Sequence, residues 1–169
     1  MTVLTAHVTV FQPGHPRLDR KTAIQLLKMK TSHPRTVHID IASRFDMLDM
    51  VQTVLAHLSS LVGFDEDAAH YMSVAVRESV VNAIKHGNRG DENKRVALDF
   101  TLHPKALEIQ VHDEGQGFDP LSIPDPSADE NLLKADGRGI FFMRSFMDDV
   151  SYSFPPKGGT VVRMVKKLG

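Results

Sequence analysis

Hydrophobic and polar positions along residues 35–169 follow periods that predict strands and helices in turn. The run 37–41 alternates apolar with polar side chains, as a half-buried strand does. The run 44–61 instead repeats apolar residues every three or four positions, which predicts a helix with one buried stripe. Ser43 followed by Asp46 resembles a capping box with Asp in place of Glu, so we expect the helix to begin there.

A second helix is predicted from Asp65 to Gly87, since acidic residues fill its first turn and a glycine suits its end. Two alternating runs, 96–102 and 107–113, follow it and predict a hairpin. A proline-containing stretch over 115–137 then predicts a loop.

The chain ends in a predicted helix that follows Gly139 and in two strands, 150–154 and 160–166. This order of elements predicts an α+β fold, in which helices cover one face of a mixed, mostly antiparallel sheet. Residues 1–34 lack this rhythm, because prolines and a glycine interrupt a short apolar run and a short helical pattern. We therefore expect an N-terminal extension over 1–34 and one domain over 35–169.

Composition excludes several classes of protein. Twenty Lys and Arg stand against 21 Asp and Glu, so the chain lacks the basic excess typical of nucleic-acid binding. Cysteine is absent, which excludes disulfide frameworks, cysteine-based metal sites and thiol nucleophiles. The N-terminus does not resemble a signal peptide, and no apolar run reaches the length of about 18 residues that predicts a membrane span. We expect a cytoplasmic protein without direct contact with membrane or nucleic acid.

Glu78 and Asn82 are the first candidate residues for chemistry. They lie four residues apart on the second predicted helix and therefore share one face. An amide oxygen can ligate a hard cation such as Mg²⁺, and a carboxylate beside it can accept a proton from a nucleophile. A solvated pair on a helix surface explains the same spacing, so both interpretations stay open at this point.

Asp113 is the second candidate, because it continues the apolar face of the run 107–111. A carboxylate at the end of such a row needs hydrogen-bond donors. Gly115 and Gly117 follow it and allow the backbone to approach a ligand closely. An exocyclic amine such as that of adenine would suit this acceptor, but an Asp that only starts a turn explains the sequence equally well.

Gly137, Arg138 and Gly139 open the next predicted helix, and backbone amides at a helix N-terminus bind phosphate. Arg138 would add a charged contact, whereas a glycine-rich helix entry without any ligand is the alternative. The loop before them is long for a compact domain, so we expect a lid over about 118–136. The run 158–160 by itself indicates only a turn before the last strand.

In their order and spacing these motifs resemble the Bergerat-type ATP-binding fold shared by histidine kinases and gyrase-type topoisomerases. The runs VRESVVNAIKHGN, VHDEGQGFD and GRGIFFMRSFMDDV are most similar to the bacterial anti-sigma factor serine kinases. The resemblance covers about residues 35–168. It implies an α/β sandwich with a mobile lid, with ATP and Mg²⁺ as cofactors.

The resemblance also implies a role for each candidate residue. Asn82 would be the Mg²⁺ ligand, and Glu78 would be the catalytic base that activates an acceptor serine. Asp113 would bind the adenine amine. The other implied nucleotide contacts are Lys85, His86, Gly115, Gly117, Gly137, Arg138, Gly139 and Thr160.

Kinases of this type bind a sigma factor and phosphorylate a serine on a STAS-type anti-sigma factor antagonist, and many are homodimers through the first helix of the fold. Here that helix is 44–61, whose methionine-rich stripe faces either the core or a partner. Residues 1–34 have no counterpart in the minimal family domain. Arg77 stands where the family usually has a small residue, and Asp129 or Glu130 in the predicted lid would be a partner for its charge.

Three other functions stay open on the sequence. The main alternative is an ATP- or ADP-binding partner-switching module with little or no kinase activity, which would use the same site. A detached catalytic half of a histidine kinase would need a helix bearing the phosphoacceptor, and His33 is a poor candidate because Pro34 breaks such a helix. A stand-alone domain that supports a phosphatase partner is the third.

Overall fold

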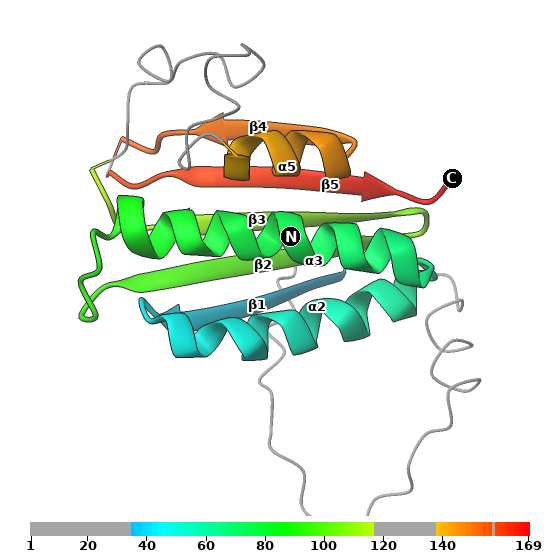
Figure 1. Ribbon diagram of the computed structural model, residues 1–169, viewed down its shortest axis with the longest axis horizontal. Helices are drawn as coiled ribbons and strands as arrows, with labels where there is room; N and C mark the ends of the chain where they lie inside the picture. The colour runs from blue at the N-terminus through cyan, green and yellow to red at the C-terminus, as the bar shows by residue number, and fades with distance from the viewer. Residues whose placement is uncertain (1–34, 117–137, 157) are drawn as a thin grey trace, which may run out of the picture. The chain divides into compact units, whose positions relative to one another are not determined.

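The computed structural model describes residues 35–116, 138–156 and 158–169, which hold a five-stranded sheet with helices packed on one face (Figure 1). The strand order is β1-β2-β3-β5-β4, and every pairing in it is antiparallel. The strands are β1 (Arg35–Ala42), β2 (Arg95–His103), β3 (Ala106–Asp113), β4 (Asp149–Ser153) and β5 (Val161–Lys167). The predicted α+β fold, including the hairpin of β2 and β3, is confirmed.

The helices lie on the face of the sheet that Figure 1 turns toward the viewer. α2 (Leu48–Val62) and α3 (Glu66–Asn82) run side by side, and α3 also contacts α5 (Arg138–Phe146), which lies in front of β4 and β5. The predicted extension over 1–34 and the predicted lid over about 118–136 lie outside the described residues, so both stay predictions. Among the described helices, none has the length and apolar character needed to cross a bilayer.

The core lies between the sheet and these helices and follows the predicted alternation. Every second residue of β2 is buried from Val96 to Leu102, and β3 repeats the pattern from Leu107 to Val111. Burial of one such side chain stabilises the fold by about 1.5–3 kcal/mol, so the buried rows of β2 and β3 both contribute to stability. The largest fully buried side chains include Phe100, Ile41, Leu55, Met72, Ile84, Leu98, Leu107 and Ile109.

The entry into the first helix differs from the prediction. A short 3₁₀ turn, η1 (Phe45–Met47), precedes α2, and no side chain caps either element. The capping-box prediction is wrong because its two residues have other partners. Asp46 forms an ion pair with Arg44 at 2.7 Å, and the hydroxyl of Ser43 accepts a hydrogen bond from Asn88 at 3.1 Å.

The buried stripe of α2 does not include Met50 of the methionine-rich stripe. Leu48, Val51 and Leu55 are buried, whereas Met50 is 41% exposed and Phe45 just before the helix is 53% exposed. The core therefore takes the leucine and valine positions. An apolar surface remains at the start of α2.

α3 begins where the sequence predicts and ends in a less regular turn. The side chain of Asp65 caps this helix by accepting a hydrogen bond from the amide of Ala68 at 2.8 Å. After Asn82 the chain continues as a π-helical turn, η2 (Ala83–Gly87), rather than as α-helix. Such turns add a residue per helical turn and are frequent at functional sites.

Candidate functional site

The candidate site begins where the end of η2 meets the end of β3. Gly87 packs directly onto the carboxylate of Asp113, and a Cβ added to Gly87 would overlap that group and lie 2.8 Å from its Oδ1. The φ of Gly87 is not in the left-handed region, so the glycine is required for space and not for conformation. Any side chain at this position would displace the carboxylate.

The carboxylate of Asp113 is held by backbone amides. Its Oδ1 accepts hydrogen bonds from the amide of Gly115 at 2.8 Å and from the amide of Thr160 at 3.1 Å. The amide of Asp113 in turn donates to the carbonyl of Thr160 at 3.1 Å. Both hydrogen bonds that the described residues give this half-buried carboxylate end on Oδ1, so Oδ2 keeps its lone pairs for another donor. Within the described ranges, the predicted need for donors is met on Oδ1.

Two further glycines bring bare backbone to the same carboxylate. Gly115 lies so close to the backbone of Gly87 that an added Cβ would come within 2.8 Å of the Gly87 carbonyl carbon. The amide of Gly159 donates to the carbonyl of Gly115 at 2.7 Å, and Gly159 has a left-handed φ of 86°. A Cβ on Gly159 would overlap the carbonyl oxygen of Asp113. Three glycines far apart in the chain therefore surround one aspartate.

The second part of the site joins α3 to the first turn of α5. A Cβ on Gly139 would lie 2.8 Å from Oε2 of Glu78 and 3.5 Å from Nδ2 of Asn82. Glu78 and Asn82 are both half-buried. The amides in the first turn of a helix have no acceptor within that helix and favour an anion. The motifs at Asn82 and Gly139 lie 57 residues apart in the sequence yet meet on one side of the site.

Other predicted nucleotide contacts lie at the edge of this arrangement or outside it. Lys85 and His86 are exposed on η2, and their predicted approach to phosphate stays a prediction. Gly117 and Gly137 lie outside the described residues, as does the side chain of Arg138.

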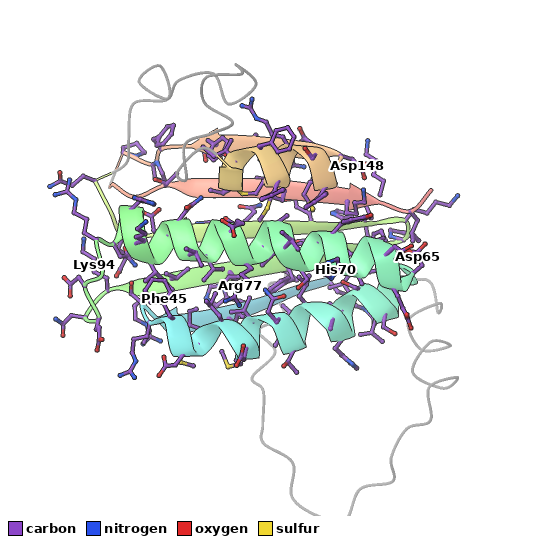
Figure 2. All side chains as sticks on the ribbon, in the orientation of Figure 1. Phe45, Asp65, His70, Arg77, Lys94 and Asp148 are labelled. Carbon is purple, nitrogen blue, oxygen red and sulfur yellow. The ribbon has the colours of Figure 1, made fainter. Side chains whose placement is uncertain are left out.

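Thr160 and Arg77 differ in burial. Thr160 is 4% exposed and contacts Asp113 through its backbone amide and carbonyl. Arg77 is exposed on α3 (Figure 2). Its predicted partners in the lid, Asp129 and Glu130, lie outside the described residues.

Two residues of the site, Gly87 and Asn88, lie in no sequence pattern that predicts a functional role. Gly87 has the position of an ordinary helix-ending glycine, and only its contact with Asp113 shows why a side chain is excluded. Asn88 follows in what looks like a polar loop, yet it is fully buried. Its Oδ1 accepts a hydrogen bond from the amide of Glu114 at 2.8 Å, directly after Asp113.

Comparisons with known proteins agree on one family. The model of the histidine kinase-like ATPase domain matches residues 41–166. A serine-protein kinase RsbW from Listeria monocytogenes is 25% identical over 146 residues, which cover 83% of this chain and 91% of the relative. A serine-protein kinase RsbW from Bacillus subtilis is 27% identical over 138 residues, which cover 78% of this chain and 85% of the relative.

A solved structure shares the fold. The crystal structure of the RsbU and RsbW domains of Rv1364c from Mycobacterium tuberculosis matches 79% of this chain with a TM-score of 0.58 and 18% sequence identity. The match covers 32% of that longer chain. At this identity the likeness bears on the fold alone, and it agrees with the predicted sandwich.

Proposed function

Because the chain belongs to the histidine kinase-like ATPase domain family, we propose that it is an ATP-dependent protein-serine kinase that acts as an anti-sigma factor. The family predicted from the three motifs is confirmed, and the curated relatives named above are serine-protein kinases. Three finer parts belong to the proposal: dependence on Mg²⁺, binding of a sigma factor, and phosphorylation of a serine on a STAS-type antagonist. The resemblance and the chemistry of the site support them.

The observation that carries the proposal is the state of the Asp113 carboxylate. Oδ1 is engaged by two backbone amides, while Oδ2 lies beside the bare backbone of Gly87 and accepts no hydrogen bond from the part of the chain that the structure describes. An acceptor fixed in this way suits the exocyclic amine of adenine. Guanine would present a carbonyl oxygen to the same carboxylate with no proton between them, so we expect GTP to bind poorly.

The residues between α3 and α5 fit a magnesium-bound triphosphate. Asn82 offers the amide oxygen that a hard cation prefers. Gly139 places no side chain between Glu78 and the first turn of α5, whose amides favour phosphate. When bound, Mg·ATP would supply the phosphoryl group for transfer. Lys85, His86 and Arg138 are proposed as additional contacts to its phosphates.

Glu78 is proposed as the general base. Its Oε2 lies at the first turn of α5, one helical turn before Asn82 on the same face of α3. A serine hydroxyl that reaches this end of the site would meet a carboxylate able to take its proton as the oxygen becomes a nucleophile. α3 holds this carboxylate on a packed element rather than on a loop, which keeps its position defined.

Calorimetric titration with ATP and ADP, with and without Mg²⁺, tests the nucleotide part of the proposal. The wild-type chain should bind ATP in a Mg²⁺-dependent way, and Asn82→Ala should lose that dependence. Asp113→Asn should keep the two contacts to Oδ1 but present an amide donor to the adenine amine, and so bind ATP more weakly. A wild-type chain that binds neither nucleotide would contradict the proposal.

Transfer to a STAS-type antagonist separates the kinase from a partner-switching module. Glu78→Gln should retain ATP binding and partner binding but lose serine phosphorylation, because the amide cannot accept the proton. A wild-type chain that binds ATP and its partners yet transfers no phosphate would favour the module with little or no kinase activity.

A homodimer through α2 is also part of the proposal. The exposed side chains of Met50 and Phe45 at the start of this helix support it, since exposed apolar side chains are available for an interface. Sedimentation of the wild type and of Met50→Glu would test it. Equal masses for both, at the value of a monomer, would contradict it.

A further inference from the structure

Asn88 is a buried polar side chain at the junction of three strand ends. It has no exposed surface, and its Nδ2 donates hydrogen bonds to the carbonyl of Arg95 at 2.9 Å and to the hydroxyl of Ser43 at 3.1 Å. Its Oδ1 accepts from the amide of Glu114 at 2.8 Å. Ser43 follows β1, Arg95 begins β2 and Glu114 follows β3. One amide group therefore connects the ends of all three strands.

This amide lies where the ladder between β2 and β3 stops. The last pair of that ladder is Val96 with Asp113. The next two residues, Arg95 and Glu114, are bridged by Asn88, and the carboxylate of Glu114 accepts a hydrogen bond from the amide of Arg95 at 2.6 Å. The three residues form a closed ring of hydrogen bonds, which we call the Asn88 ring. The ring begins at the residue that follows Asp113.

We propose that Asn88 is a positioning residue that fixes the turn from Asp113 to Gly115 and so sets the adenine end of the nucleotide site. The inference rests on the ATP-dependent function proposed above. The backbone amide of Asn88 also donates a hydrogen bond to the carbonyl of Ala83 at 2.7 Å across the π-helical turn. The same residue therefore ties the turn that carries Gly87 to the strand that carries Asp113, and these two groups lie in direct contact.

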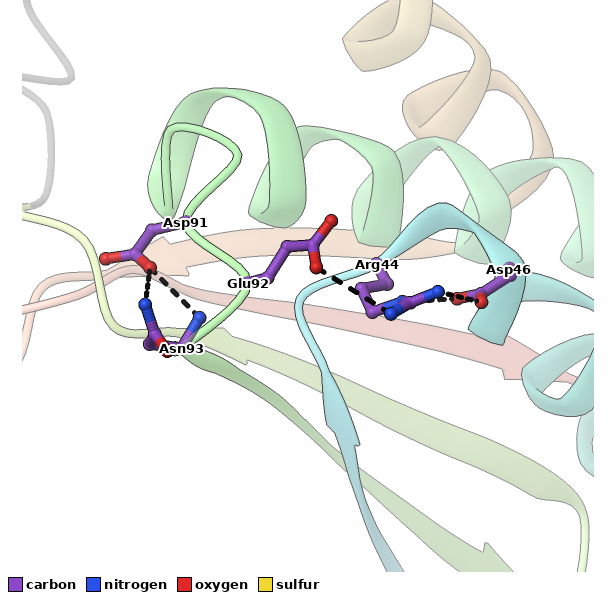
Figure 3. A network of polar contacts seen from close by, with 5 residues as sticks. All are labelled: Arg44, Asp46, Asp91, Glu92 and Asn93. Atoms are coloured by element: carbon purple, nitrogen blue, oxygen red, sulfur yellow. Dashed lines mark hydrogen bonds and ion pairs between the residues drawn. The ribbon is translucent and has the colours of Figure 1, made fainter.

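The loop that follows Asn88 has contacts of its own, shown in Figure 3. The side chain of Asp91 accepts hydrogen bonds from the amide of Asn93 at 3.0 Å and from its side chain at 3.1 Å. Glu92 lies 3.7 Å from Arg44, and both side chains are largely exposed. Exposed ion pairs of this kind contribute little to stability, whereas a buried and fully hydrogen-bonded amide such as that of Asn88 orders its surroundings. Glu92 therefore offers a control in the same loop.

Calorimetric titration of the full chain with ADP and ATP tests the proposal, at a temperature well below the unfolding midpoint. Asn88→Ala should bind both nucleotides at least about tenfold more weakly, because the base end of the site loses its alignment. The ratio of ATP to ADP affinity and the effect of Mg²⁺ should not change, since Glu78, Asn82 and Gly139 lie on α3 and α5. A changed ratio would place the effect at the phosphate end and overturn the proposal.

Two control variants separate positioning from stability. Ser43→Ala removes one partner of the same amide but leaves its hydrogen bond to Glu114. It should lower the unfolding temperature and leave ADP affinity within about twofold of wild type. Glu92→Ala should change neither quantity. A loss of ADP affinity in Ser43→Ala equal to that in Asn88→Ala would mean that general destabilisation explains both, and would overturn the proposal.

A second variant decides the question if Asn88→Ala does not fold. Glu114→Ala opens the same ring from an exposed side chain and should weaken ADP binding by at least about threefold. Unchanged ADP affinity in a folded Asn88→Ala, or in Glu114→Ala if Asn88→Ala is unfolded, would overturn the inference alone. A wild-type chain that binds no nucleotide would overturn the proposed function itself.

Discussion

Replacement of Gly87 by alanine isolates the close approach between η2 and Asp113. Because the φ of Gly87 is not left-handed, alanine adds no conformational strain there. Its Cβ would instead overlap the carboxylate of Asp113, lying 2.8 Å from Oδ1. Either η2 moves away from β3, or the carboxylate leaves the amides of Gly115 and Thr160.

The free-energy cost of each response follows from typical values for overpacked contacts and for lost hydrogen bonds. Forcing an extra methyl group into a packed contact costs about 1–3 kcal/mol. If the carboxylate moves, ATP loses a hydrogen bond to a charged acceptor, which contributes about 1.5–3 kcal/mol. At about 1.4 kcal/mol for each factor of ten, this loss corresponds to a rise of roughly 10- to 150-fold in the dissociation constant of ATP. We therefore expect Gly87→Ala to remain folded and to bind ATP at least about tenfold more weakly.

Calorimetric titration with ATP measures this effect, and Gly90→Ala is the matched control. Gly90 lies three residues further along, has a left-handed φ of 71°, and has open space where a Cβ would be. Alanine there strains the backbone by about 1–2 kcal/mol without touching the site. Its unfolding temperature should fall while its ATP affinity stays the same. Undiminished ATP affinity in Gly87→Ala, or an equal loss in Gly90→Ala, would show that the contact between Gly87 and Asp113 does not set ATP affinity.

Three further predictions concern the phosphate end, a helix cap and acid stability. In Gly139→Ala the new methyl group should press on Oε2 of Glu78 and slow serine phosphorylation by up to about 100-fold. The rate is measured as kcat with a STAS-type antagonist, and an unchanged kcat would contradict the proposed role of Glu78. Asp65→Ala should lower the free energy of unfolding by about 1 kcal/mol in urea titration, without changing ATP affinity. Although burial acts to raise it, hydrogen bonds from Arg163 and a neighbouring glutamine hold the pKa of Glu108 below its usual value. The ionised carboxylate stabilises the fold fully above this usual value and loses that contribution as the pH falls through the lower pKa of the folded state. Glu108→Gln should therefore lose less free energy of unfolding than wild type as the pH falls from about 5 to about 3.

Local patterns were sufficient for most of the fold. The strands and helices could be predicted because burial of one face imposes a period of two on β2 and β3 and a helical period on α2 and α3. The start of α3 near Asp65 could be predicted because acidic residues fill its first turn, where the helix dipole favours them. The capping box failed for the opposite reason, since Ser43 bonds to Asn88, 45 residues away.

The candidate site divides in the same way. Local spacing is enough to put Glu78 and Asn82 on one face, because they lie one helical turn apart, and to put Asp113 at the end of a buried row. The groups that surround that aspartate come together through long-range packing. Gly87 and Thr160 reach it from other elements, and the choice of glycine at position 87 depends on a carboxylate 26 residues away. Close packing excludes a side chain at position 87, and the local periodicity of the sequence does not predict this.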